Sequence, residues 1–326
     1  MNGNGFTTTF EMLPLNGLDC YKPELYKARE KAHTLPLRFG LCTSFEAGPE
    51  VWEKERETWN SDFVFHLGLK LFVDGVPQGS MTAWLTEPYT NRDDGWCGEA
   101  VIDMDMVRDY VKKANDMGIG VRAHCTGDRA CIEMIDAYSQ SSNTKVINCL
   151  EHGMAVTDPF LDKVREYTKT KILGVNAQPG IIGADRASRL TEIFLGTERT
   201  ERSWGFQSLK KAGATVCFSS DCPNAFADIY DIFCYAANRL SDGTGPYAGV
   251  GLGMDEAYSA AEILMALTAE PAKTIGRDNF IGKLKPGFKA DIAIFDQDIF
   301  AMDRMEYGNI RIYKTILNGE EVYKKA

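Results

Sequence analysis

GIGVRAHCTGDRA (118–130) decides the fold: a short apolar run ends at His124, and a helix-like segment follows it. KVINCLEHG (145–153), with His152 next to its end, and ATVCFSSDCP (214–223) repeat this arrangement. Each run predicts a buried parallel strand with a metal-competent side chain at its C-terminal end. Because a (β/α)₈ barrel carries its chemistry on the loops that follow its strands, we expect the three strand ends to share one face.

Strand-like and helix-like segments alternate on both sides of this stretch. The strand-like segments lie at 5–13, 35–44, 67–75, 119–125, 145–151, 172–178 and 214–220. The helix-like segments lie at 21–33, 49–60, 103–117, 128–140, 157–168, within 180–212, and at 255–276. This repetition is typical of a parallel α/β fold, and neither GxGxxG after the first strand nor GxxxxGK[ST] occurs to indicate a nucleotide-binding sheet. We therefore predict an α/β protein with a TIM (β/α)₈-type barrel over residues 1–277.

The pattern changes after the segment 255–276. GKLKPGFKADIAIFDQD (282–298) and YKTILNGEEVYKK (313–325) contain short strands separated by turn residues, and Asn-Gly in the second is a hairpin signal. We predict a small β appendage over residues 278–326.

The composition excludes several classes of protein. The 326 residues carry a formal net charge of -10, which disfavours nucleic acid and anionic membrane surfaces as partners, because both bind clustered Lys and Arg. No apolar run approaches the ~18 residues of a membrane span, and MNGNGFTTTFEM (1–12) lacks the regions of a signal peptide. The nine cysteines are scattered without a CxxC pair. We expect a cytoplasmic protein that acts on a small molecule, with no nucleic-acid or membrane partner.

Lys70 lies between Leu69 and Leu71 in the strand-like segment LGLKLFVDG (67–75). A free cation is costly to bury in such a run unless it is paired or chemically altered. One interpretation is a lysine that extends between the outer helices. The other is an inward lysine that is either an ion-pair partner or a carbamylated, metal-bridging ligand.

Two histidines and an aspartate are the other candidates for a metal site. His124 and His152 suit a Zn²⁺-like ion as neutral imidazoles, and Asp221 can ligate a metal or take a proton from its bound water. A lone strand histidine more often packs in a core. Two of them at strand ends, together with a strand-end aspartate, favour a functional site.

Several motifs resemble the amidohydrolase superfamily, specifically the family 3 branch that includes N-substituted formamide deformylase. In order they are GLKLFVDG, AHCTGDRA, CLEHG, SSDCP, KPGFKADIAIFD and ILNGEEVY. The resemblance runs from Gly5 to the C-terminus. It implies that Lys70, His124, His152 and Asp221 surround a divalent metal, most simply Zn²⁺, and that an activated water attacks an amide or related C–N bond with Asp221 as the proton shuttle.

The resemblance also implies a substrate pocket. Asp128 and Arg129 would belong to the loop that shapes it, although an N-terminal helix cap with an exposed charge explains them equally well. Trp84 and Trp96, in the loop 75–99, are candidate pocket walls, and packing on the barrel rim is the alternative for both.

The chain departs from the family at its first strand. Family members are longer and have a first barrel strand that ends in His-x-His, a pattern that does not occur here. We expect a barrel without its first strand, a C-terminal remnant of a small β-sandwich, and one metal site at most, which could be empty. Unpaired strand edges would remain, so we expect either a truncated product or a homo-oligomer or second chain that covers the open barrel edge.

Three functions compete. The first is a metal-dependent hydrolase of C–N bonds in non-peptide amides, formamides or cyclic amides. The second is a catalytically inactive, truncated homologue that acts as a regulatory or binding protein. The third is a pyridoxal-phosphate barrel with Lys70 as the Schiff base, which leaves His124 and His152 without roles.

Overall fold

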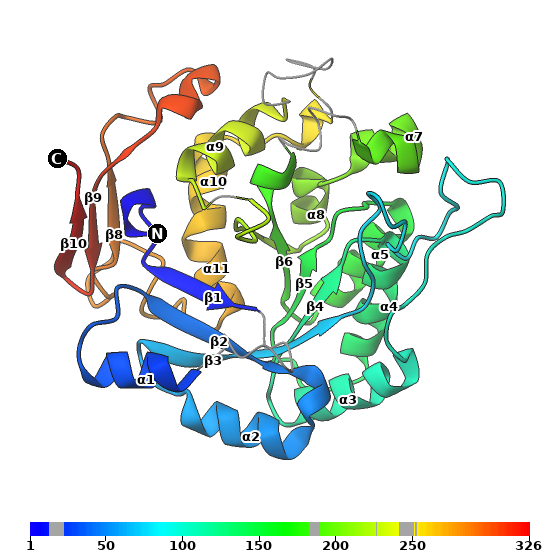
Figure 1. The fold of residues 1–326 in the computed structure, drawn as a ribbon, viewed down its shortest axis with the longest axis horizontal. Coiled ribbons are helices and arrows are strands. Elements are labelled where there is room, and N and C mark those ends of the chain that lie inside the picture. Colours follow the sequence, from blue (N-terminus) through cyan, green and yellow to red (C-terminus); the bar gives the residue numbers. More distant parts are fainter. Residues whose placement is uncertain (13–22, 183–189, 226, 241–250, 252) are drawn as a thin grey trace.

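The computed structural model describes residues 1–12, 23–182, 190–225, 227–240, 251 and 253–326. Its main feature is a curled parallel sheet of seven strands that pair in chain order (Figure 1). The strands are β1 (Thr8–Glu11), β2 (Arg38–Ser44), β3 (Val64–Phe72), β4 (Val121–Cys125), β5 (Asn148–His152), β6 (Leu173–Ala177) and β7 (Thr215–Phe218). The seven strands predicted from the apolar runs are thereby confirmed, with shifted ends.

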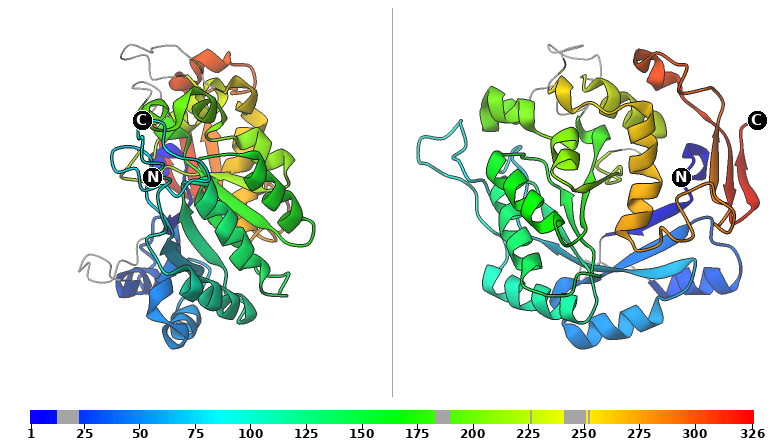
Figure 2. Two further views of the ribbon diagram at one scale, coloured as in Figure 1. Left: turned by 90° about the vertical axis from the view of Figure 1, so that its right-hand side faces the viewer. Right: turned by 180° about the vertical axis from the view of Figure 1, so that it is seen from behind.

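Helices cover the convex side of this sheet (Figures 1 and 2). Those that follow the first strands are α1 (Pro23–Lys31), α2 (Pro49–Thr58), α3 (Met104–Asp116), α4 (Asp128–Ser139), α5 (Asp158–Thr168) and α8 (Phe206–Lys211). The remaining helices are α7 (Leu190–Arg202), α9 (Ile229–Asn238), α10 (Ala260–Leu267) and α11 (Ala269–Thr274). No described helix is both long enough and apolar enough to cross a membrane.

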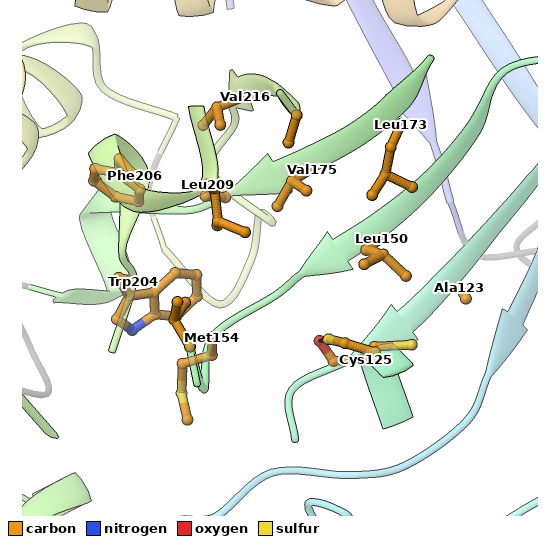
Figure 3. Packing of buried hydrophobic residues seen from close by; sticks show 14 of the residues in the cluster. Ala123, Cys125, Leu150, Met154, Leu173, Val175, Trp204, Phe206, Leu209 and Val216 are labelled. Carbon is orange, nitrogen blue, oxygen red and sulfur yellow. Dashed lines mark hydrogen bonds between the residues drawn. The ribbon is translucent and has the colours of Figure 1, made fainter. Parts of the chain in front are cut away.

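Alternation along the strands separates the two sides of the sheet. Apolar residues of β4 to β7 point toward the helices and form the main core, in contact with side chains from the segment before α8 and from α8 itself (Figure 3). The residues shown there include Ala123, Leu150, Val175, Val216, Trp204, Phe206 and Leu209. The intervening residues point to the concave side, where the polar candidates lie.

The sheet is not closed within the described residues, because its order begins at β1 and ends at β7. Figures 1 and 2 place α10 and α11 on this open side. The carbonyl oxygen of Thr274 in α11 accepts a hydrogen bond of 3.1 Å from Nη2 of Arg122, an inward residue of β4. The Thr274 hydroxyl also lies 3.7 Å from Sγ of Cys217 in β7. The end of α11 therefore reaches the concave side of the sheet and fills part of the gap.

The predicted C-terminal β appendage is an antiparallel sheet of β8 (Ile292–Phe295), β9 (Ile312–Leu317) and β10 (Glu320–Lys324). Asn318 and Gly319 join β9 to β10 with φ of 52° and 90°, the left-handed geometry of an Asn-Gly hairpin turn. The short 3₁₀ helix η1 (Asn2–Asn4) contacts this sheet, and Thr315 donates to the carbonyl oxygen of Asn2 at 2.7 Å. The boundary at 278 stays a prediction.

One expectation about an individual element was wrong, one strand begins earlier than expected, and one helix was not predicted. The single helix expected at 255–276 is interrupted at Thr268 (φ -129°, ψ -80°), so α10 and α11 are separate helices. β3 begins at Val64 rather than at 67, which places His66 inside the strand. The helix α9 was not predicted, although the buried residues of its sequence IYDIFCYAAN recur at helical spacing (Ile229, Ile232, Phe233, Ala236, Ala237).

Candidate active site

The two candidate histidines meet at the C-terminal ends of neighbouring strands. His124 lies in β4 and His152 ends β5. Their ring centroids are 4.5 Å apart, with the ring planes at 69°. The ring centroid of Phe72, in β3, lies 5.3 Å from that of His124. The structure therefore brings together the imidazoles that the sequence placed at equivalent strand ends.

The orientation of His152 depends on its backbone. Glu151 points to the concave side, where it contacts Arg122 and Asn176, so strict alternation would direct His152 toward the outer helices. The φ of His152 is 78°, a left-handed value that is uncommon for a histidine. This local departure from strand geometry turns the ring toward His124.

Hydrogen bonds fix one nitrogen of each ring. His152 Nδ1 lies 2.8 Å from Oε1 of Gln178, and His124 Nε2 lies 3.3 Å from the carbonyl oxygen of Gly75. Burial lowers the pKa of both histidines, that of His124 to about 2, and the positive charge of Lys70 lowers both further. Both rings are therefore neutral, and each keeps one nitrogen lone pair for another partner.

Lys70 lies on the concave side, and only 7% of its surface is exposed. Its Nζ lies 4.6 Å from the ring centroid of Phe72, and no carboxylate of the described residues lies within the 4.0 Å of an ion pair. Burial lowers the pKa of Lys70, and Glu151 is the strongest of the neighbouring groups that oppose this shift. Lys70 therefore points to the concave side, as one of the two interpretations expected. Among the described residues, no carboxylate lies close enough to its ammonium to form an ion pair.

Asp221 lies after β7 and is half-buried, with φ of 56°. Its Oδ2 accepts a hydrogen bond of 2.8 Å from Asn224. Its negative charge raises the pKa of both Lys70 and His152, so it lies within electrostatic reach of them. In the described part of the chain, however, no three His, Cys, Asp or Glu side chains gather closely enough to hold a metal.

Asp74 is a residue of this site that sequence reasoning missed. It is 2% exposed, and Oδ1 lies 3.9 Å from Nε2 of His124. Its carboxylate accepts backbone hydrogen bonds from Trp84 (2.9 Å), Thr126 (3.0 Å) and Gly127 (2.8 Å). Burial nevertheless raises the pKa of Asp74 to about 7. An acidic residue at the end of the run LGLKLFVDG was the signal that could have identified it.

Asp74 joins two loops at the mouth of the sheet. One is the segment 75–99, which carries Trp84, and the other follows β4. A Cβ atom on Gly127 would lie 2.0 Å from the carbonyl oxygen of Trp84, so only glycine permits this approach. The loop 75–99 is therefore held in place by specific polar contacts rather than by apolar packing alone.

The four residues expected to bind substrate lie in or beside this loop. Asp128 is buried, and its carboxylate accepts hydrogen bonds from the backbone and hydroxyl of Thr86 and from Thr157 (3.0 Å). Arg129 is exposed, pairs with Glu133 at 3.0 Å, and places its guanidinium 5.5 Å from the ring centroid of Trp84. The indole nitrogen of Trp96 donates to Met81 at 2.8 Å.

A pocket lies next to this group, between the loop 75–99, the start of α5 and α7. Its polar lining comes from Thr86, Glu87, Asp128, Thr157, Asp158, Glu198, Arg199 and Arg202. Of the four expected substrate-binding residues only Asp128 lines it, and neither His124 nor His152 does. The roles of Asp128, Arg129, Trp84 and Trp96 in substrate binding stay predictions.

Comparison with known proteins gives consistent results. The family model described as "Amidohydrolase family" matches residues 1–323. The protein YtcJ of Bacillus subtilis (strain 168) is 25% identical over 304 residues, which cover 92% of this chain and 55% of YtcJ. The N-substituted formamide deformylase of Arthrobacter pascens is 25% identical over 226 residues, which cover 68% of this chain and 39% of that enzyme.

A solved structure also resembles this chain in both fold and sequence. The crystal structure of an uncharacterised metal-dependent hydrolase from Pyrococcus horikoshii OT3 superposes with a TM-score of 0.73 at 25% identity, and covers 92% of this chain and 56% of that one. The chain spans about half the length of the curated relatives that it matches.

Proposed function

Because the chain belongs to the amidohydrolase family, we propose that it is a metal-dependent hydrolase that cleaves a C–N bond in a small, non-peptide amide, formamide or cyclic amide. The observation that carries this proposal is the pair of neutral imidazoles, His124 and His152, whose centroids are 4.5 Å apart at the mouth of the sheet. Two such side chains would serve a single ion such as Zn²⁺, for which imidazole is a common ligand.

The donor chemistry fits one cation and not two. Each imidazole has one nitrogen engaged by a neighbouring oxygen and one nitrogen left for a metal. The buried Nζ of Lys70 has no close counter-charge among the described residues, which suits a ligand that is neutral or carbamylated when metal is bound. A divalent cation held here would polarise the substrate carbonyl and lower the pKa of water to about 7.

The remaining roles fall to other residues of the chain. The Asp221 carboxylate would accept the proton of the attacking water and return it to the leaving nitrogen, while Asn224 holds one of its oxygens. The loop 75–99, with Trp84 and Trp96, would exclude bulk water and shape the substrate. Asp128 and Arg129 would act in the same region.

Metal titration with Zn²⁺ or Co²⁺ tests the proposal. We expect one ion per chain in the wild type, and a loss of affinity of at least tenfold in His124→Asn and in His152→Asn. His33→Asn is the matched control, because His33 is exposed beside α1. Two tightly bound ions per chain, or unchanged affinity in both site variants, would contradict the assignment.

A non-catalytic regulatory or binding protein is the second candidate. It is favoured by the described residues, in which no cluster of three His, Cys, Asp or Glu side chains forms a ready metal site. Hydrolysis of a panel of formamides and cyclic amides with added Zn²⁺ separates the two: turnover that is lost in His152→Asn supports the enzyme, and binding without turnover supports the alternative.

We also propose a homo-oligomer in which a second chain covers the open side of the sheet. Support comes from β1 and β7, each of which has a strand neighbour on one side only among the described residues. Light scattering after gel filtration measures the mass of the assembly. A monomer at all concentrations would exclude this arrangement.

A further inference from the structure

We infer that Gln178 is a positioning residue that fixes the tautomer of His152, with the proton on Nδ1 and the free lone pair on Nε2. Gln178 follows β6, one residue beyond Ala177, in the segment AQPG (177–180). The consequence for metal binding rests on the proposed function, whereas the tautomer itself does not.

The hydrogen bonds of Gln178 determine how its amide is oriented. Nε2 of Gln178 lies 2.8 Å from the carbonyl oxygen of Asn176 and 3.1 Å from Oγ of Ser219. A carbonyl oxygen only accepts hydrogen bonds, so the amide NH₂ must face Asn176. The amide oxygen then faces Nδ1 of His152 at 2.8 Å, and this oxygen can only accept. The proton must therefore lie on Nδ1 of His152.

Burial makes the alternative orientation costly. Gln178 is 2% exposed and His152 is 8% exposed, so solvent does not readily replace a lost partner. A rotated amide would set its oxygen against the carbonyl oxygen of Asn176, which has no proton to donate, and would lose the hydrogen bond that this oxygen accepts. The orientation of the Gln178 amide is thus fixed by groups at the ends of two strands. Asn176 belongs to β6, and Ser219 directly follows β7.

The consequence is that the ring of His152 enters the site with a defined nitrogen. A histidine ligand is commonly oriented in this way by a hydrogen bond to its other nitrogen, and removal of such a partner lowers metal affinity by about 10- to 100-fold. Gln178 also joins the strand that ends in His152 to the strand that leads to Asp221. No other described side chain accepts from Nδ1 of His152.

Nitrogen-15 NMR of histidine-labelled, metal-free protein tests the tautomer directly. The chain has four histidines, and His152→Asn assigns the relevant signals. We expect a protonated Nδ1 and an unprotonated Nε2 in the wild type. Gln178→Met removes the acceptor at nearly constant volume and should give mixed tautomers. Gln178→Glu loses the donor to Asn176 but keeps an acceptor that faces Nδ1, so the proton should stay on Nδ1. Gln207→Met is the matched control, because Gln207 makes its hydrogen bonds with Ala257 and Glu262.

The inference is overturned if the wild type carries the proton on Nε2, or if Gln178→Met leaves the wild-type tautomer intact. If Gln178→Met does not fold, Gln178→Glu decides the matter, since loss of the Nδ1 proton in that variant contradicts the inference. Zn²⁺ titration then measures the consequence, a 10- to 100-fold weaker affinity in Gln178→Met. A wild type that binds no Zn²⁺ would refute the proposed function and leave the tautomer result standing.

Discussion

Arg122 and Glu151 form an ion pair on the concave side of the sheet, with Nη1 3.3 Å from Oε1 and both side chains no more than 5% exposed. Glu151 also accepts from Asn176 at 2.7 Å, and the guanidinium of Arg122 lies 5.6 Å from the ring centroid of Phe10 in β1. Through Thr274 the same arginine contacts α11. One buried cation therefore connects β1, β4, β5 and α11 in a sheet that is open between β7 and β1.

Removal of this cation should destabilise the protein strongly. Arg122→Met leaves Glu151 buried without its counter-charge, and we expect the free energy of unfolding to fall by about 3–5 kcal/mol. Urea denaturation measures the change. Arg122→Met combined with Glu151→Gln should cost less than the sum of the single substitutions. Arg165→Met, at the exposed ion pair with Asp162, is the control and should have little effect. Additive effects of the two buried substitutions would show that the pair is not coupled.

The carboxylate of Asp74 should control the order of the mouth loops. Asp74→Ala removes the acceptor of three backbone hydrogen bonds, so the amides of Trp84, Thr126 and Gly127 should exchange with deuterium faster than in the wild type. Hydrogen–deuterium exchange with mass spectrometry measures this. Asp94→Ala, in the same loop but exposed, should leave these three amides unchanged. Unchanged protection in Asp74→Ala would show that other contacts hold the loop.

The stability of the fold should depend on the protonation of His66. Burial lowers the pKa of this histidine to about 4, below the ordinary value of 6.5. Between these values the unfolded chain binds more protons than the folded one, so stability rises with pH through this window and is lost as the pH falls. The slope from His66 is at most ~1.4 kcal/mol per pH unit.

Denaturation midpoints at pH 5 and pH 7 test this dependence. His66→Gln should reduce the difference between the two pH values, since glutamine cannot gain a charge. The variant His33→Gln, at an exposed position beside α1, should retain the wild-type difference. Equal pH dependence in the wild type and His66→Gln would assign the effect to other groups.

Asp221→Asn should separate proton transfer from metal binding. If Asp221 is the proton shuttle, kcat/KM on the formamide and cyclic amide panel should fall by about 10²- to 10⁴-fold with Zn²⁺ present. Zn²⁺ affinity should change little, because the proposed ion is held by His124 and His152, and Asp221 acts as the proton shuttle. Rates equal to those of the wild type would remove the assigned role of Asp221.

Much of the fold follows from local patterns. Each short apolar run is a strand of the parallel sheet, because a strand that is buried on both faces needs consecutive apolar residues. Asn318-Gly319 forms the expected hairpin, because these two residue types favour the left-handed backbone of such a turn. Other features have no local signal. The break at Thr268, for example, divides a segment with continuous helical character into two helices.

The candidate site also combines features that the sequence predicts with features that only the folded chain shows. The sequence by itself determined that His124 and His152 stand at the ends of adjacent strands, since strand order follows chain order. Only the tertiary structure decided that the ring of His152 faces His124, because a φ of 78° overrides the alternation of the strand. It also decided that Asp74 and Gln178 support the two histidines. Their partners are backbone and side-chain groups of other strands and loops, and contacts of this kind form only when the chain is folded.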